Sequence, residues 1–405
     1  MAKTIKYLLV LLGFSACSQP IPAPQPSTTA TSVEVVAKSL RLGAERTEEY
    51  LPLLKGKTVG IIANQTSTIE QTHLVDSLMS LGVNIKHVFG PEHGFRGNVT
   101  RGKKIGDSID EKTGLKIVSL YGDNRKPAPQ NLEGLDVIIF DIQDVGVRFF
   151  SYLSTMSYVM EACAEHDITM IVMDRPNPNG HYTDGPGMDK EFTSIVGQHQ
   201  VPVVHGMTVG EYAKMVNGEG RLKDGIQCNL KVIEMENYSH QLTYSLPIKP
   251  SPNLPNLKSI YLYPSLCFFE GTVVNEGRGT DKPFQQFGYP KMPNGNTIYT
   301  PKFIKGVAET PSFKDQKCNG IDLSLLSEDS LRNMASINLN WLIQAYQDYP
   351  EKETFFNKNF FDKLAGSSAL REQIIAGRSA EEIRKTWETD LLEFEEIRKK
   401  YLVYP

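Results

Sequence analysis

Polar or glycine-rich segments follow five apolar runs of the chain, which lie at residues 57–63, 84–89, 116–120, 136–140 and 168–173. The polar and charged side chains in the segments that follow are Asn64, Glu92, His93, Arg96, Tyr121, Asp141, Gln143, Asp144, Asp174, Arg175 and Asn177. Such a set of carboxylates, amides and aromatic rings is suited to sugar chemistry, in which a carboxylic acid protonates the leaving oxygen. The sequence therefore predicts a polar cleft that binds a sugar.

Glu92 is the strongest candidate for that acid. It lies in the segment Gly90-Pro-Glu-His-Gly94, where flanking glycines and a proline favour a rigid turn. A carboxyl group held in a partly desolvated turn retains its proton more readily, as a general acid requires. The spacing alone leaves a structural alternative open, in which Glu92 caps a neighbouring helix or pairs with Arg96.

A second charged cluster occupies residues 269–280, where Glu270, Glu276 and Arg278 lie among glycines. Glycine allows a backbone to approach a ligand closely, and arginine binds carboxylates through two parallel hydrogen bonds. The alternative is a buried Glu–Arg pair that holds two domains together. Similarly, Asp144, Arg148, Asp174 and Arg175 could form a structural ion-pair network. The segment His205–Thr208 is expected to begin a helix, with Thr208 as its N-cap.

Several ligand classes are disfavoured by the motifs. No G-x-G-x-x-G segment follows the first apolar run, and the chain has neither a Walker P-loop nor a G-x-S-x-G nucleophile elbow. We therefore predict no nucleotide cofactor. The histidines lack the spacing of a metal site, although His93 could meet Asp141 and Asp144 in space. A metal-dependent hydrolase stays an alternative on that ground.

The elements that must position these residues follow a βαβ rhythm. The five apolar runs are expected to be strands, and residues 68–81 and 150–166 have helical spacing. This alternation predicts an α/β fold with a mostly parallel, doubly wound sheet, whose ligands bind at the carboxyl ends of the strands. After a Pro-rich boundary at residues 247–255, we expect a strand at 259–262, a loop-rich stretch to about residue 320, and helices. The last helix is expected to begin at about Ala380.

The N-terminus has the pattern of an export signal. Lys3 and Lys6 precede an apolar run at residues 7–14, and small residues precede Cys17. This arrangement resembles a bacterial lipoprotein signal (1–17) in which Cys17 is lipidated, followed by a Pro/Ser/Thr tether at residues 18–34. The alternative is cleavage near Ala16, which gives a soluble exported protein. Either way the protein is expected to be exported to the periplasm, and only a lipid anchor would join it to a membrane.

The composition is that of an ordinary globular protein. The 405 residues include 43 Lys and Arg against 47 Asp and Glu, for a net charge of −4, and 40% are hydrophobic. No region is basic enough to suggest a nucleic-acid partner. The mature chain keeps four cysteines, which could form one disulfide or remain buried thiols: Cys163, Cys228, Cys267 and Cys318.

Taken together, these segments resemble a bacterial family known as NamZ, formerly domain of unknown function 1343. The matching segments are GPEHGFRG (90–97), DIQDVGVRFFSYLSTM (141–156), DRPNPNG (174–180), PVVHGMTVGEYA (202–213), PSPNLPN (250–256), YPSLCFFEGTVVNEGRGTDKPF (263–284) and WETDLLEFEEIRKKYLVYP (387–405). One departure is Asn275, where the family pattern leads us to expect serine. The resemblance spans nearly the whole mature chain.

The resemblance implies an exo-β-N-acetylmuramidase, which hydrolyses terminal N-acetylmuramic acid from the non-reducing end of peptidoglycan fragments. It also implies a Rossmann-like domain (35–245), a smaller C-terminal α/β domain (246–405) and a cleft between them. The family's catalytic glutamate corresponds to Glu92. The second catalytic group is expected to be Glu276 or Glu270, with Asp144 behind them, unless the substrate's own acetamido group serves as nucleophile.

The remaining expected contacts follow from the substrate. The lactyl carboxylate of muramic acid needs a cation, for which Arg278, Arg148 and Arg96 are candidates, and His205 is expected to bind substrate as well. A non-catalytic lipoprotein that binds cell-wall sugars has the same signal, tether and body, so it stays the alternative from another class.

Overall fold

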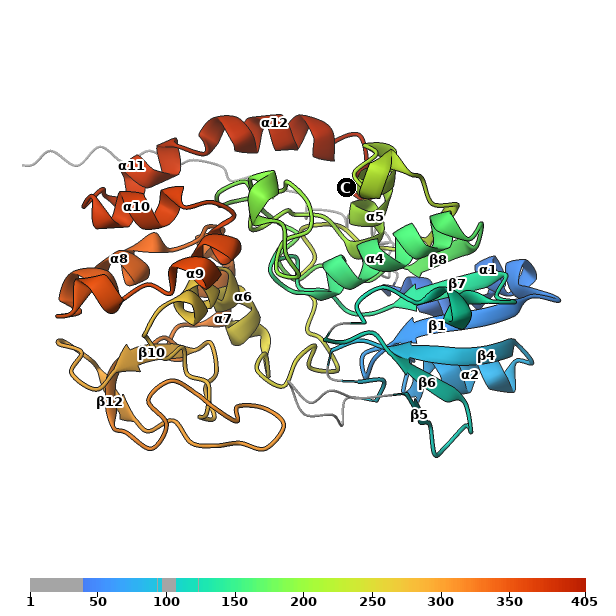
Figure 1. Ribbon diagram of the computed structural model, residues 1–405, viewed down its shortest axis with the longest axis horizontal. Helices are drawn as coiled ribbons and strands as arrows, with labels where there is room; N and C mark the ends of the chain where they lie inside the picture. The colour runs from blue at the N-terminus through green and yellow to red at the C-terminus, as the bar shows by residue number, and fades with distance from the viewer. Residues whose placement is uncertain (1–38, 93, 97–106, 123) are drawn as a thin grey trace, which may run out of the picture. The chain divides into compact units, whose positions relative to one another are not determined.

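A seven-stranded sheet in the order β5-β6-β4-β1-β7-β8-β9 organises the N-terminal part of the chain (Figure 1). The structure is a computed structural model that describes residues 39–92, 94–96, 107–122 and 124–405. The strands of the sheet are β1 (Thr58–Ala63), β4 (Asn84–Gly90), β5 (Ser108–Ile109), β6 (Lys116–Ser119), β7 (Val137–Asp141), β8 (Thr169–Met173) and β9 (Leu230–Ile233).

All pairs in this sheet are parallel except β5 with β6. The six parallel strands, numbered along the chain, have the spatial order 3-2-1-4-5-6, which is that of a doubly wound sheet. The five predicted strands correspond to β1, β4, β6, β7 and β8, and the predicted fold class is confirmed. In such a sheet the segments after β1, β4, β6, β7 and β8 emerge at one edge, which we call the carboxyl edge.

Helices cover both faces of the sheet. The helices of the N-terminal part are α1 (Thr47–Leu54), α2 (Leu74–Ser80), α3 (Pro129–Leu132), α4 (Tyr152–Glu165) and α5 (Val209–Gly218). Alternate residues of β7 point to opposite faces: Ile138 and Phe140 join a core with α4 and α5, whereas Val137 and Ile139 join a core with α1 and α2. Burial on both faces explains why β7 is a continuous apolar run.

Residues 68–81 differ from the expected single helix. A short hairpin of β2 (Thr68–Ile69) and β3 (Thr72–His73) occupies the first part, and only α2 is helical. Glu70 has a φ of +50°, a turn conformation that ends helical geometry at this point.

The C-terminal part combines a small antiparallel sheet with helices. Its strands are β10 (Gln286–Tyr289), β11 (Thr297–Tyr299) and β12 (Cys318–Asp322), in the order β10-β12-β11. Its helices are α6 (Leu257–Leu266), α7 (Glu328–Met334), α8 (Leu339–Asp348), α9 (Lys358–Ala365), α10 (Ala369–Ile375), α11 (Ala380–Lys385) and α12 (Glu388–Arg398). The stretch expected to be rich in loops therefore contains a sheet.

The expected strand at residues 259–262 was wrong, because this segment lies inside α6. Asn256 caps that helix by accepting a hydrogen bond from the Ser259 N–H at 3.0 Å, which starts helical geometry just before the apolar run. The run is buried on every side, and such a run has no periodicity that distinguishes a helix from a strand.

The expected C-terminal helix is divided at Trp387 into α11 and α12. Ile383, Trp387 and Phe394 of this segment are buried, so its apolar side chains pack inward. Thr208 caps α5 as predicted, and its hydroxyl accepts the Glu211 N–H at 3.2 Å.

Residues 39–405 form one compact unit, so the predicted boundary between residues 245 and 246 stays a prediction. The four cysteines of this unit are buried thiols without a disulfide. None of the helices in the described part of the chain combines the length and apolar character needed to cross a bilayer.

Candidate active site

Glu92 lies two residues beyond the end of β4, at the carboxyl edge of the sheet. Its carboxylate accepts a hydrogen bond from the Ser151 hydroxyl at 3.0 Å, and its backbone carbonyl accepts one from the Tyr152 hydroxyl at 3.2 Å. Burial, and then the Glu92 carboxylate, raise the pKa of Tyr152, so the phenol stays protonated and continues to donate. The start of α4 thus holds both the backbone and the side chain of Glu92.

The segment after β6 emerges beside Glu92, because β4 and β6 are neighbouring parallel strands. The Leu120 N–H donates to the Gly90 carbonyl at 2.9 Å, which joins the two segments where they leave the sheet. Gly122 then turns the chain with a φ of +72°, a value that favours glycine. The Arg125 side chain closes this turn by donating from Nε to the Gly122 carbonyl at 3.1 Å.

The second predicted cluster forms a largely buried charged group of two glutamates and one arginine, in which Glu276 is buried and Glu270 and Arg278 are partly exposed. The Arg278 Nη2 donates to Glu270 Oε1 at 2.8 Å, and Arg278 Nε lies 2.8 Å from Glu276 Oε1 without the alignment of a hydrogen bond. The Arg278 guanidinium also lies 5.0 Å from the centre of the Phe284 ring. All three charged residues belong to the C-terminal part, so the group does not tie two domains together.

Glycine is required beside this group. Gly277 has a φ of +83°, and a Cβ there would lie 2.3 Å from the Lys282 carbonyl oxygen. The Gly277 N–H donates to the Asn275 side chain at 2.9 Å. Any other residue at position 277 would force this turn to open, and with it the backbone that carries Glu276 and Arg278.

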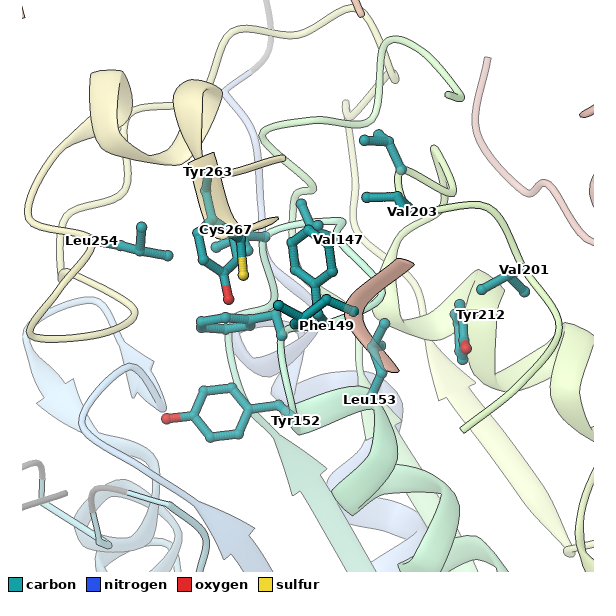
Figure 2. Close-up of a cluster of buried hydrophobic side chains, with 14 of the residues drawn as sticks. Val147, Phe149, Tyr152, Leu153, Val201, Val203, Tyr212, Leu254, Tyr263 and Cys267 are labelled. Atoms are coloured by element: carbon teal, nitrogen blue, oxygen red, sulfur yellow. The ribbon is translucent and has the colours of Figure 1, made fainter. Parts of the chain in front are cut away.

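Glu92, Glu270 and Arg278 line the same cavity of about 430 Å³. Its other lining residues are Leu120, Tyr121, Gly122, Arg125, Phe149, Phe150, Ser151, Tyr152, Thr155, Ile195, Val196, Ser251, Asn253, Tyr263, Cys267, Phe360 and Leu364. Figure 2 shows Tyr263 and Cys267 of the C-terminal part approaching Phe149, which precedes α4, and the Phe149 and Tyr263 rings lie 5.4 Å apart, edge to face. The cavity therefore joins two carboxylates with an aromatic wall, an arrangement suited to a sugar ring.

Two of the predicted site residues form a buried ion pair behind the rim. Arg175 donates from Nη2 to Asp141 Oδ2 at 2.9 Å, and both side chains are almost completely buried. Arg175 also donates to the Thr68 carbonyl at 3.2 Å. This pair ties β7 to the segment after β8, and neither residue lies in the lining of the cavity.

Arg148 has a different environment from the expected ion-pair network. Its guanidinium donates four hydrogen bonds of 2.6 to 3.0 Å to backbone carbonyls, which belong to Pro186, Val201, Leu364 and Ala365. Burial lowers the pKa of Arg148 to about 10. Arg148 thus braces three segments around the cavity without a carboxylate partner among the described residues.

The other acidic residues of the expected network are buried too. Asp174 accepts hydrogen bonds from the Thr208 and Tyr404 hydroxyls and from the Gly210 N–H, at 2.6 to 2.8 Å. Burial raises the pKa of Asp174 to about 6. These bonds join the segment after β8 to the start of α5 and to the C-terminal tail.

Asp144 accepts the Gly146 N–H at 2.6 Å, and burial raises its pKa to about 7. Its Oδ2 lies 4.0 Å from the Nε2 of His205, whose pKa burial lowers to about 3. His205 Nδ1 accepts the Met207 N–H at 3.2 Å, so the imidazole is neutral and carries its proton on Nε2. Neither Asp144 nor His205 lines the cavity.

Three predicted amide residues also connect the segments at the carboxyl edge through hydrogen bonds. Gln143 donates to the Asp144 and Pro176 carbonyls, both at 2.7 Å, and Asn177 donates to the Met207 carbonyl at 2.8 Å. Asn64 accepts the Thr66 N–H at 2.8 Å and lies beside the Tyr152 hydroxyl, directly behind the cavity wall.

Arg96 belongs to another part of the surface, where it donates to Asp110 and Asp76 at 2.8 to 3.3 Å. His93 and Cys17 lie outside the described residues. Of the predicted contacts, the structure thus brings Glu92, Tyr121, Glu270 and Arg278 to the cavity, with Glu276 just behind them. A direct contact between substrate and the others stays a prediction.

Sequence reasoning missed Arg125, Ser151, Tyr152 and Tyr263, which all line the cavity. Ser151 and Tyr152 lie inside an expected helix, and Tyr263 lies in an apolar run, so nothing in the local pattern distinguished them from packing residues. Arg125 follows β6 at the carboxyl edge, and that position was the one available signal. Among the residues that the structure describes, no three His, Cys, Asp or Glu side chains are placed to hold a metal ion.

A doubly wound sheet with carboxylates and aromatic rings in a cavity at its carboxyl edge is an arrangement that suits an α/β glycoside hydrolase. Two family models match the chain: the N-terminal part of exo-β-N-acetylmuramidase NamZ over residues 59–258, and its C-terminal part over residues 261–404. The chain belongs to this NamZ family of exo-β-N-acetylmuramidases.

Individual relatives agree with this assignment. The chain is 37% identical over 375 residues to the peptidoglycan β-N-acetylmuramidase NamZ of Bacillus subtilis (strain 168), a match that covers 88% of this chain and 89% of the relative. Two crystal structures of DUF1343 family proteins from Bacteroides fragilis NCTC 9343 share its fold. One has a TM-score of 0.84 at 46% identity and covers 91% of this chain and 99% of its own. The other has a TM-score of 0.74 at 29% identity, with coverages of 90% and 99%.

Proposed function

We propose that this enzyme releases N-acetylmuramic acid from the non-reducing end of peptidoglycan fragments, with Glu92 as the general acid. The observation that carries the proposal is the presence of Glu92, Glu270 and Arg278 in the lining of one cavity at the carboxyl edge of the sheet. Ser151 binds the Glu92 carboxylate and Tyr152 binds the Glu92 backbone carbonyl, and together they fix the position of this residue. A carboxyl held in this way can protonate the glycosidic oxygen as the bond to the leaving group breaks.

Glu270 is the better candidate for the second carboxylate. It lines the cavity, whereas Glu276 does not, and Arg278 lies between the two. Arg278 Nη2, which donates to Glu270, stabilises that carboxylate as an anion, the form in which it can act as a base or nucleophile. Asp144 is fully buried away from the cavity lining, so we assign it no part in the chemistry.

The test replaces Glu92 by glutamine, which keeps the size and the hydrogen-bonding capacity of the side chain but cannot donate a catalytic proton. With a chromogenic β-N-acetylmuramide, we expect Glu92→Gln to lower kcat by about 100-fold or more, because general acid catalysis contributes roughly 10²–10⁴-fold. Binding of the sugar is expected to persist, as measured by calorimetry.

The matched control is Glu381→Gln, since Glu381 is an exposed residue of α11 that pairs only locally with Lys385. This variant is expected to keep the turnover of the parent enzyme. Near-normal turnover of Glu92→Gln would remove Glu92 from the mechanism.

The two alternatives are tested on the same protein. A binding protein would retain the disaccharide MurNAc-GlcNAc intact, whereas the enzyme is expected to convert it into two monosaccharides. A metal-dependent hydrolase would lose this activity in EDTA, whereas the proposed carboxylate mechanism is expected to proceed at an unchanged rate.

We propose further that the protein is exported and anchored through a lipid on Cys17. The proposal is supported by the basic residues Lys3 and Lys6, the apolar run that follows them, and the Pro/Ser/Thr-rich segment after the cysteine. Such a segment would act as a tether between the membrane and the catalytic body.

A further inference from the structure

The substrate of the proposed function carries a negative charge that a neutral sugar lacks. N-acetylmuramic acid differs from N-acetylglucosamine by a lactyl ether at the 3-position, which ends in a carboxylate. A site that distinguishes the two sugars gains most from a cation in the wall of its cavity. Among the described residues, the lining contains two arginines, Arg125 and Arg278.

The arginines expected from sequence for this contact are already engaged. Arg278 is held between the carboxylates of Glu270 and Glu276. Arg96 pairs with Asp76 and Asp110, outside the lining of this cavity. A further carboxylate placed against either arginine would meet the repulsion of two existing acidic neighbours.

Arg148 is engaged as well, although its partners are neutral. Its Nη1 and Nη2 groups donate to backbone carbonyls of the surrounding segments, and the residue is only 2% exposed. A ligand would have to displace those bonds to reach the guanidinium.

Arg125 differs from these three arginines in its exposure and in its partners. It is exposed, it lines the cavity, and among the described residues its guanidinium makes one hydrogen bond, from Nε to the Gly122 carbonyl. Within the described part of the chain, no carboxylate lies within ion-pairing distance of its guanidinium. Its position after β6 places it on the same rim as Glu92, which follows the neighbouring strand β4.

We propose that Arg125 binds the lactyl carboxylate of the terminal muramic acid and is the residue that selects this sugar over its neutral analogue. The proposal rests on the proposed function and adds the specificity determinant to it. A guanidinium whose Nη groups bind no carboxylate among the described residues can bind one from a ligand through two parallel hydrogen bonds. The hydrogen bond from Nε holds the side chain at the carboxyl edge and does not use the Nη donors.

The test varies the charge on the enzyme and on the substrate together. The enzymes are the parent, Arg125→Gln and Lys126→Gln, and the substrates are a chromogenic β-N-acetylmuramide with a free lactyl carboxylate and the same muramide with its lactyl group converted to a methylamide. Lys126 is the matched control, because this adjacent cation pairs with Glu165 at 2.6 Å and Glu161 at 3.5 Å and does not line the cavity.

We expect Arg125→Gln to lower kcat/KM for the free acid by about 10- to 100-fold, the range of a hydrogen-bonded charge contact, and mainly through KM. The same variant is expected to change kcat/KM for the methylamide by less than about 2-fold. Lys126→Gln is expected to behave as the parent enzyme on both substrates. Arg125→Lys keeps the charge but lacks the two parallel N–H donors of a guanidinium. Its kcat/KM for the free acid is expected to lie between those of the parent and the glutamine variant.

Two outcomes overturn the proposal. An equal loss on both substrates would mean that Arg125 supports the shape of the rim, and an unchanged kcat/KM on the free acid would mean that it contacts no carboxylate. Failure of the parent enzyme to release muramic acid from the free-acid substrate would instead refute the proposed function. The three results are distinguishable in one set of assays.

Discussion

Asp144 provides a quantitative test of how burial controls charge in this protein. Its carboxyl group is buried and accepts a hydrogen bond from the Gly146 N–H, and the backbone N–H groups of Gly146 and Val145 offset the effect of burial on its pKa only in part. Burial raises the pKa of Asp144 from its ordinary value of 3.8 to about 7. The folded protein therefore binds this proton far more tightly than the unfolded chain does.

This difference in pKa makes stability depend on pH in a defined direction. Below about pH 4, Asp144 is protonated in both states and carries no penalty. Between about pH 4 and pH 7 the unfolded chain releases the proton first, so the free energy of unfolding falls as the pH rises. Above about pH 7 the full cost of about 4 kcal/mol is present, because one pKa unit corresponds to about 1.4 kcal/mol.

Asp144→Asn removes the charge but keeps an oxygen that can accept the Gly146 N–H. The new amide N–H groups lose hydrogen bonds to water at this site, which costs about 1–3 kcal/mol at any pH. We therefore expect the variant to be more stable than the parent by about 1–3 kcal/mol at pH 8 and less stable by about the same amount at pH 4. The measurement is equilibrium urea unfolding of both proteins at these two pH values.

A stability difference that is the same at pH 4 and pH 8 would refute the reasoning, because it would mean that Asp144 has similar proton affinities in the folded and unfolded states. The variant also tests the assignment of the site. Since Asp144 does not line the cavity, its turnover is expected to stay within a few-fold of the parent at pH 8.

Two further predictions concern the frame of the cavity and the N-terminus. Arg148→Met removes four hydrogen bonds to backbone carbonyls but also removes the cost of desolvating the guanidinium. We therefore expect the free energy of unfolding, measured in urea, to fall by about 3 kcal/mol. An unchanged unfolding midpoint would contradict the bracing role of Arg148. Cys17→Ser is expected to abolish incorporation of a radiolabelled fatty acid in cells and to move the protein from the membrane fraction to the periplasmic fraction. Labelling that persists in Cys17→Ser would exclude this cysteine as the lipid attachment site.

The order of apolar runs and polar segments in the sequence was enough to predict the sheet and its functional edge. A strand buried on both faces must be apolar along its length, so β1, β7 and β8 are visible as nearly continuous runs. Because parallel strands share one carboxyl edge, the position of Glu92 after β4 and of Tyr121 after β6 already predicted that they lie on the same edge of the sheet. The same logic failed at α6, where burial on all sides hides the helical period.

The sequence by itself thus determined the fold class, the family and the presence of Glu92 at the carboxyl edge, since these depend on the local hydrophobic pattern and on sequence motifs. The partners of each charge were decided only by the tertiary structure. Arg148 and Arg278 are both largely buried arginines beside the cavity, yet one binds backbone carbonyls and the other binds two glutamates. The physical reason is that a charge interacts over a few ångströms with whatever the folded chain places there, and those neighbours come from segments far apart in the sequence.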